Sequence, residues 1–203
     1  MKHRFSAVAF AAVALAMIAA ESTPARATDH TDDGFARRLF GTPTGAQKSY
    51  ACFVRRYDGD HLARHRLQRV SAMRLLVTAE QDAESNTPNY SFRLGLKYRD
   101  RQGDFASSGE CGRAESADAG QFGCGVDCDG GGIEVEIATD NKSVLVKIER
   151  LRIWRNNRPD DEASSQSLAG GADDRVFRLD RAGLEDCRSL VTDRQELAAL
   201  RHK

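Results

Sequence analysis

Gly130-Gly-Gly-Ile-Glu-Val-Glu-Ile137 and Ser143-Val-Leu-Val-Lys-Ile148 are the two runs of sequence that decide the fold of this chain. In both runs apolar residues occupy every second position. Successive side chains of a β-strand point to opposite faces, so each run has one apolar face that suits burial. The turn residues Asp140-Asn141 lie between the two runs, and together these features predict a β-hairpin.

A four-residue turn over residues 140–143 sets the expected pairing of this hairpin. The predicted pairs are Thr139–Val144, Ile137–Val146, Glu136–Lys147 and Val135–Ile148. Each cross-strand pair contributes about 0.2–1 kcal/mol, and a slip of one residue would turn every apolar side chain outward. Past Ile148 the apolar positions change parity, at Leu151 and Ile153, which predicts either a bulge near Glu149-Arg150 or an end to the pairing there.

Other segments of the chain also have strand or helix patterns. Strands are expected over residues 49–56, 70–80, 91–100, 104–111, 121–129 and 175–180, and short helices over residues 35–40, 61–65, 182–190 and 193–200. Many short strands joined by turn residues are typical of an all-β protein. We therefore predict an antiparallel sandwich or barrel of at least six short strands with a short C-terminal helix. The alternative is an α+β fold, if the helical segments prove larger.

Residues 1–27 have the pattern of a secretory signal peptide. A basic start, Met1-Lys-His-Arg4, precedes a mostly apolar run from Phe5 to Ala20, and Ala25-Arg-Ala27 has the small-x-small pattern of a cleavage point. A membrane anchor, the alternative, asks for about 20 apolar residues. We expect residues 28–203 to remain as a single secreted β-rich domain.

The charge of the chain excludes some classes of partner. It has 30 basic and 30 acidic side chains, so no overall positive charge attracts nucleic acid. After cleavage of the signal peptide no second apolar run is long enough to predict a membrane span. These features predict a protein of the periplasm or the extracellular space.

All five cysteines lie after the predicted cleavage point, and an oxidising compartment favours disulfides. If residues 116–119 form the turn of a hairpin, Cys111 faces Cys124 with Cα atoms about 4.5 Å apart, which a disulfide accepts. We therefore predict a bond between Cys111 and Cys124. Cys52, Cys128 and Cys187 are left to supply one further bridge and one free thiol, in an order that the sequence leaves open.

No motif predicts a metal centre or a catalytic site. His61 and His65 have a spacing that places both rings on one helix face, but Leu62 stands where a zinc-protease helix has glutamate. Residues 127–132 begin like a calcium loop, but Gly131 and Ala138 occupy positions that need oxygen ligands. We expect no cofactor and no metal.

A cluster of arginines is the strongest candidate for a binding surface. Its members are Arg55, Arg56, Arg64, Arg66, Arg69 and Arg74. The planar guanidinium suits phosphate and carboxylate groups, so an anionic envelope component or a protein is the expected partner. The alternative is an ordinary exposed strand face whose arginines pair with Glu134, Glu149 or the acids of residues 160–162.

Two further features bear on the site. Residues 156–174 are rich in Asp, Ser and Gly, which predicts a mobile surface loop. Trp154 is the only tryptophan, and we expect it to pack in the core rather than to line a rim.

The sequence favours a non-enzymatic binding module over two alternatives. One is a hydrolase or metal-dependent enzyme that uses His61 and His65, which requires both rings and a carboxylate to converge in a cleft. The other is an inhibitor of another enzyme, which needs a protruding ordered loop, and residues 156–174 are the only long candidate.

Overall fold

The computed structural model describes residues 30–45, 47–85, 87–113, 120–155 and 165–200. Nine strands form one antiparallel sheet: β1 (Ser49–Arg56), β2 (Val70–Gln81), β3 (Pro88–Tyr98), β4 (Phe105–Gly112), β5 (Gln121–Gly125), β6 (Gly131–Ile137), β7 (Ser143–Arg155), β8 (Ser165–Ala169) and β9 (Val176–Ala182). The helices are α1 (His30–Phe40), α2 (Gly59–Arg64), the 3₁₀-helix η2 (Leu184–Leu190) and α3 (Arg194–Ala199). The prediction of an all-β antiparallel fold with a short C-terminal helix is confirmed.

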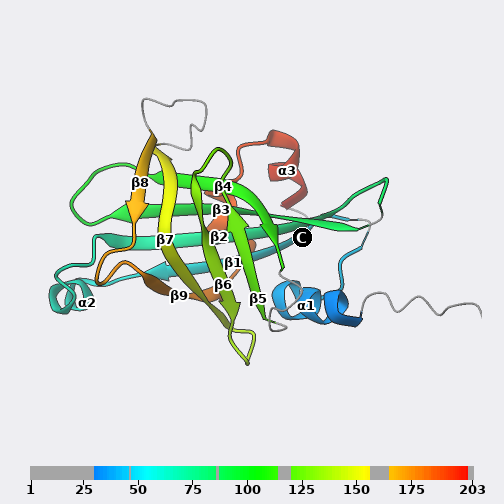
Figure 1. The fold of residues 1–203 in the computed structure, drawn as a ribbon, viewed down its shortest axis with the longest axis horizontal. Coiled ribbons are helices and arrows are strands. Elements are labelled where there is room, and N and C mark those ends of the chain that lie inside the picture. The colour runs from blue at the N-terminus through cyan, green and yellow to red at the C-terminus, as the bar shows by residue number, and fades with distance from the viewer. Residues whose placement is uncertain (1–29, 46, 86, 114–119, 156–164, 201–203) are drawn as a thin grey trace, which may run out of the picture.

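Strand β7 closes this sheet into a ring. The strand order is β6-β5-β4-β3-β2-β1-β9-β7-β8, and β7 also pairs with β6 at the far end of that order. Residues 143–147 of β7 pair with β9, and residues 144–151 pair with β6. In Figure 1 β5, β6 and β7 cross in front of β1, β2 and β3, so the ring has two crossing layers.

The hairpin of β6 and β7 exists, but its predicted register is wrong by two residues. Ile137 pairs with Val144 and Val135 with Val146, and the opposite-charge pair is Glu134–Lys147. The turn comes one residue earlier, because the N–H of Ala138 bonds the Ser143 carbonyl and Asn141 takes a left-handed φ of 57°. A shift of two preserves the face of every side chain, so the predicted core residues remain buried.

A bulge in β7 explains the change of parity after Ile148. Ile133 pairs with Ile148 whereas Gly131 pairs with Leu151, so β7 holds one extra residue at Glu149-Arg150. The bulge turns Leu151 and Ile153 inward, where both are fully buried. Of the two alternatives left by the sequence, the structure has the bulge, and β7 then continues to pair with β8 and β4.

Apolar side chains fill the interior of the ring. The cluster draws on every strand, with Phe53, Phe92, Phe105 and Phe177 among its largest fully buried members. Helix α1 covers one end, where the ring of Phe35 meets those of Tyr90 and Phe122 edge to face. Trp154 is 6% exposed, which confirms its prediction as a packed side chain.

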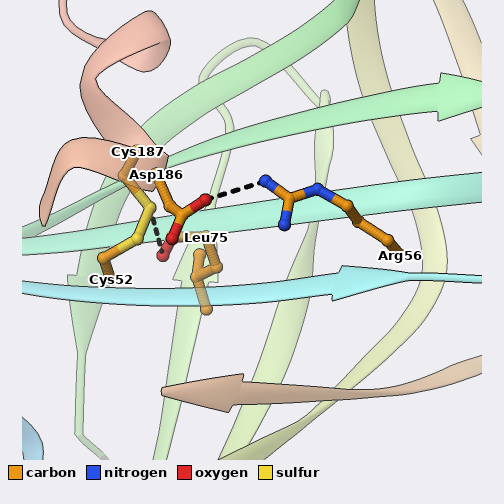
Figure 2. The surroundings of a disulfide bond; sticks show 5 residues. All are labelled: Cys52, Arg56, Leu75, Asp186 and Cys187. Carbon is orange, nitrogen blue, oxygen red and sulfur yellow. Dashed lines mark hydrogen bonds and ion pairs between the residues drawn. A yellow bond between two sulfur atoms is a disulfide. The ribbon is translucent and has the colours of Figure 1, made fainter. Parts of the chain in front are cut away.

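The C-terminal tail packs on the outside of the ring. Leu190, Val191 and Leu200 form a second apolar cluster with Val54 and Leu76, on the outer face of β1 and β2. A disulfide between Cys52 and Cys187 fixes η2 to β1, as Figure 2 shows. By the chain-entropy relation, a bridge that closes a loop of this length stabilises the fold by about 5 kcal/mol.

The predicted disulfide between Cys111 and Cys124 is present. The two residues face each other across β4 and β5 with Cα atoms 4.0 Å apart. Cys128 is free and exposed. Residues 116–119, the predicted turn of this hairpin, lie outside the described residues.

The prediction of one loop over residues 156–174 needs correction. Residues 165–169 form β8, whose Leu168 is fully buried, and Asp174 is also fully buried. Apolar area at Leu168 and pairing with β7 order this stretch despite its polar composition. Residues 156–164 and the predicted signal peptide, residues 1–27, lie outside the described residues. None of the described helices is long and apolar enough to cross a membrane.

A buried carboxylate ties the segment before β9 to the start of β2. Asp174 accepts hydrogen bonds from the backbone N–H groups of Arg69 and Val70, at 2.8 and 3.1 Å, and from Arg69 Nε at 3.2 Å. Buried backbone N–H groups that lose their acceptor are costly. Asp174 therefore holds the mouth of the ring next to α2.

Asp174→Ala should lower the free energy of unfolding by about 3 kcal/mol, because it leaves two backbone N–H groups and a guanidinium without their acceptor. Chemical denaturation of the variant measures this change. Asp173→Ala is the matched control, since that neighbouring side chain is only partly buried, and it should change stability by about 0.5 kcal/mol or less. Equal effects of the two substitutions would contradict the role of Asp174.

A second charged cluster holds α3. Glu196 accepts two hydrogen bonds from Arg93, at 3.0 and 2.9 Å, and lies 3.3 Å from Lys48 Nζ. Burial acts to raise the pKa of Glu196, but the hydrogen bonds and positive charges of Arg93 and Lys48 outweigh it and lower this pKa overall. In the same corner, burial and the neighbouring Glu196 raise the pKa of Tyr50 to about 12.

This cluster predicts an acid-sensitive tail. Because the folded-state pKa of Glu196 is lowered, its stabilisation is complete above the ordinary glutamate pKa of about 4.3. It is lost as pH falls through the lower folded-state value. Glu196→Gln should therefore be less stable than the natural protein at neutral pH, and the gap should narrow in acid. A gap that stays constant from neutral pH down to about pH 3 would show that Glu196 is not the titrating group.

Candidate functional site

The six candidate arginines lie on several elements around one end of the ring. Arg55 and Arg56 end β1, Arg64 ends α2, and Arg74 lies within β2. Arg66 and Arg69 fall in the connection between α2 and β2. The structure therefore places the six near α2 and the adjoining ends of β1 and β2, but it does not direct them at one point.

Three of the six arginines are held by carboxylates. Arg55 lies 3.2 Å from Asp180, Arg56 lies 2.7 Å from Asp186, and Arg69 lies 3.2 Å from Asp174. The contact between Arg56 and Asp186 is drawn in Figure 2, beside the tail disulfide. These partners differ from Glu134 and Glu149, two of the acids that the sequence suggested, and the others, at residues 160–162, lie outside the described residues. Glu134 lies on β6 and Glu149 on β7, and neither strand pairs with β1, so the strand order separates both glutamates from the arginines.

The remaining contacts of Arg55 and Arg69 are also structural. The Arg55 guanidinium lies 5.2 Å from the centre of the Tyr57 ring. Burial raises the pKa of Tyr57, an effect that the charge of Arg55 opposes. Arg69 Nη2 donates to the Ala169 carbonyl at 3.0 Å, which connects β8 to the start of β2. Both side chains serve the fold in the free protein, whatever else they bind.

Arg74 differs from these side chains. It faces Gly95 across β2 and β3, and its Nε is buried without a hydrogen-bond partner. The structure gives it no ion pair with any described carboxylate within 4.0 Å. A charged group that is partly removed from water and lacks a counter-charge is costly. Arg74 is therefore the member of the cluster best suited to an external anion.

Arg74 lines a pocket of about 340 Å³ between the outer face of the sheet and η2. Lys97 and Ser189 also line it, and they bring a second cation and a hydroxyl to the same pocket. Lys97 lies 3.2 Å from Asp104, and both side chains are about half exposed or more. Leu190 supplies an apolar wall. Asp104 lines the same pocket. With that carboxylate paired to Lys97, the arrangement still offers the Arg74 guanidinium, an ammonium and a hydroxyl, which are donors that suit a phosphate or carboxylate.

The histidines form a stacked column instead of a metal site. The rings of Tyr57 and His61 lie 4.6 Å apart, and those of His61 and His65 lie 4.3 Å apart. His61 Nε2 is 3.0 Å from Gln68 Oε1, and the Asp58 carboxylate accepts from the backbone N–H of His61 to cap α2. Among the described residues no three His, Cys, Asp or Glu side chains gather to hold a metal. The described residues therefore hold no metal-binding group of the kind that a metal-dependent enzyme using His61 and His65 would need.

Cysteine chemistry is restricted in the same way. Cys111 and Cys124 are bonded to each other and Cys52 is bonded to Cys187, so only Cys128 retains a thiol. It lies in the turn between β5 and β6, and its carbonyl accepts a hydrogen bond from Arg152 Nη2 at 3.0 Å.

The inhibitor alternative depends on residues 156–174. Of these, residues 156–164 lie outside the described residues and residues 165–169 are paired with β7.

Sequence reasoning missed Lys97 and Ser189. Lys97 was visible as an outward position of a clean strand, but its approach to Arg74 depends on the pairing of β2 with β3. Ser189 lines the pocket because η2 packs on β1, where the Cys52–Cys187 bond and the second apolar cluster hold it. A pairing of Cys187 from sequence would have been the one signal that placed the tail there.

Comparison with known proteins finds no matching family model, no matching curated protein and no matching solved structure. A function for this chain therefore has to be inferred from its own residues.

Proposed function

We propose that the protein is a non-enzymatic binding module that recognises an anionic group of an envelope component or of another protein. The pocket beside Arg74 is its contact point. The observation that carries the proposal is the Arg74 guanidinium, which is partly buried, has an unpartnered Nε and lies in a pocket with Lys97 and Ser189. Phosphate and carboxylate are the two anionic groups that this set of donors fits.

The compartment belongs to the same proposal. The signal-peptide pattern of residues 1–27 and two disulfides favour an exported protein, because disulfides persist in oxidising compartments. An anionic partner in the periplasm or outside the cell is then accessible to the pocket. The filled interior of the ring supports binding at the surface, since apolar side chains already occupy the space where a carrier would hold its ligand.

The arginines outside the pocket would add a weaker, less specific attraction. Arg64 and Arg66 are exposed and lie on the same side of the ring as the ends of β1 and β2. Exposed charges separated by more than about 8–10 Å are largely screened at physiological ionic strength. They would raise the rate of encounter with a polyanion, whereas Arg74 would determine its affinity.

Arg74→Gln should weaken binding to phosphatidylglycerol vesicles by about tenfold, equivalent to about 1.4 kcal/mol, because it removes the guanidinium charge while it keeps a polar side chain. Co-sedimentation measures the change, with phosphatidylcholine vesicles as the uncharged reference. Poly-glutamate is the carboxylate probe, and competition between it and inorganic phosphate distinguishes the two anion chemistries.

Arg37→Gln on α1 is the matched control for lost charge, since Arg37 is exposed and distant in sequence from the pocket. The double variant Arg64→Gln/Arg66→Gln should change salt dependence more than affinity at physiological ionic strength. Equal loss of binding in Arg37→Gln and Arg74→Gln would reduce the effect to net charge and contradict the pocket. Absence of binding to all three anionic probes would contradict the proposed function itself.

A further inference from the structure

The charged side chains of the Arg74 pocket leave one positive charge without a partner. Among the described residues that line the pocket, Arg74 and Lys97 are basic and Asp104 is acidic. Lys97 Nζ lies 3.2 Å from the Asp104 carboxylate, so these two charges offset each other. No described carboxylate lies within 4.0 Å of Arg74. The charge that an occupant has to balance is therefore that of the Arg74 guanidinium.

A carboxylate suits this charge better than a phosphate monoester does. A carboxylate carries a single negative charge, whereas a phosphate monoester carries about −1.5 to −2 at pH 7. The additional negative charge of a phosphate would lie in the same pocket as the Asp104 carboxylate, and like charges repel. The planar guanidinium of Arg74 still offers a carboxylate two parallel hydrogen bonds. The charges of the pocket therefore favour a carboxylate.

The rest of the pocket wall favours an apolar group beside that carboxylate. Apart from Ser189, the remaining lining residues have no polar side chain; they are Gly95, Leu96, Phe105, Ala106 and Leu190. Gly95 pairs with Arg74 on one side and with Ala106 on the other, so the guanidinium and the apolar wall are neighbours on the sheet. An anion with a small apolar substituent therefore meets both.

The size of the pocket limits the substituent. The volume of about 340 Å³ is near the lower end of the range for small-molecule sites, which is roughly 300–1,000 Å³. This space takes one residue-sized group. The Lys97–Asp104 pair, whose side chains are about half exposed or more, lines the same space and suits a polar peptide backbone better than a hydrocarbon chain.

From the charge, the wall and the size of the Arg74 pocket, we propose that it binds the free C-terminal carboxylate of a partner polypeptide whose last residue is apolar. The inference rests on the proposed function and specifies its anion and its partner. The carboxylate pairs with Arg74, the Ser189 hydroxyl donates to it, and the last side chain packs on Leu190 and Ala106. Capture of a chain terminus is a recurring mode of peptide recognition.

An acetylated tripeptide of two alanines and a C-terminal leucine is the probe. Titration of the isotope-labelled protein, followed by amide NMR signals, measures its affinity and its location. The same peptide with a C-terminal amide lacks only the charge, and the same peptide ending in glycine lacks the apolar side chain. Butyl phosphate and octanoate test the phosphate and the fatty-acid alternatives.

The free leucine peptide should bind at least about tenfold more tightly than each of the other four probes. The signals of Lys97 and Ser189, which line the pocket, should shift most. Equal binding of the amidated or the glycine peptide, or equal or tighter binding of butyl phosphate or octanoate, would overturn the inference and leave the proposed anion-binding function intact. Absence of binding by every carboxylate and phosphate probe would contradict the proposed function as well.

Asp104→Asn tests the charge argument. It removes the acid and leaves the Lys97 ammonium without its partner, so the pocket gains a second uncompensated positive charge. The affinity for butyl phosphate should then rise by about tenfold, and more than the affinity for the leucine peptide. The preference for the peptide should therefore narrow or reverse.

Asp100→Asn is the matched control, because Asp100 is an exposed acid of the same β3–β4 connection that does not line the pocket. It should leave the preference for the leucine peptide unchanged. Thermal unfolding establishes that both variants keep the fold. An unchanged preference in Asp104→Asn, or an equal change in the two variants, would refute the charge match on which the inference depends.

Discussion

The pairing of β7 on both of its edges is the interaction on which the rest of the structure depends. On one edge β7 bonds β6, its hairpin partner, and on the other it bonds β9, which continues to β1. This closure leaves few strand edges unpaired and encloses a continuous apolar core. The bulge at Glu149-Arg150 lets one long strand serve two parts of the wall, because it restores the inward direction of the apolar side chains.

Because apolar side chains fill the interior of the ring, the proposed recognition takes place at the outer surface. Two structural devices shape that surface, and each contains a disulfide. The Cys52–Cys187 bond holds η2 against β1 and so builds one wall of the Arg74 pocket. The Cys111–Cys124 bond joins β4 to β5 beside the exposed residues Gly112 and Gly123.

The alternation of apolar and polar residues predicted the strands of this fold. It failed for the hairpin register and for the ion pairs, because both depend on residues that are distant in the sequence. Alternation in residues 49–56 fixes β1, and hairpin pairing alone located the Cys111–Cys124 bond. The register of β6 and β7 was missed because the left-handed Asn141, whose side chain accepts from Arg38 Nε at 3.0 Å, moves the turn. Arg74 was among the binding residues that the sequence predicted. The acids that hold Arg55, Arg56 and Arg69 were not predicted, because they come from residues 174–186 and only the folded ring brings them near.

Native-state hydrogen exchange of β7 tests the closed ring most directly. Residues 144–147 pair with β6 on one side and β9 on the other, and the Ile148 N–H bonds the Arg175 carbonyl just before β9. The amides of residues 144–148 should therefore exchange only through global unfolding, as slowly as those of residues 73–77 in the middle of β2. The amides of β8, which pairs with β7 alone, should exchange faster. Exchange of residues 144–148 as fast as that of β8 would contradict the closure, and with it the sealed core and the restriction of binding to the outer face.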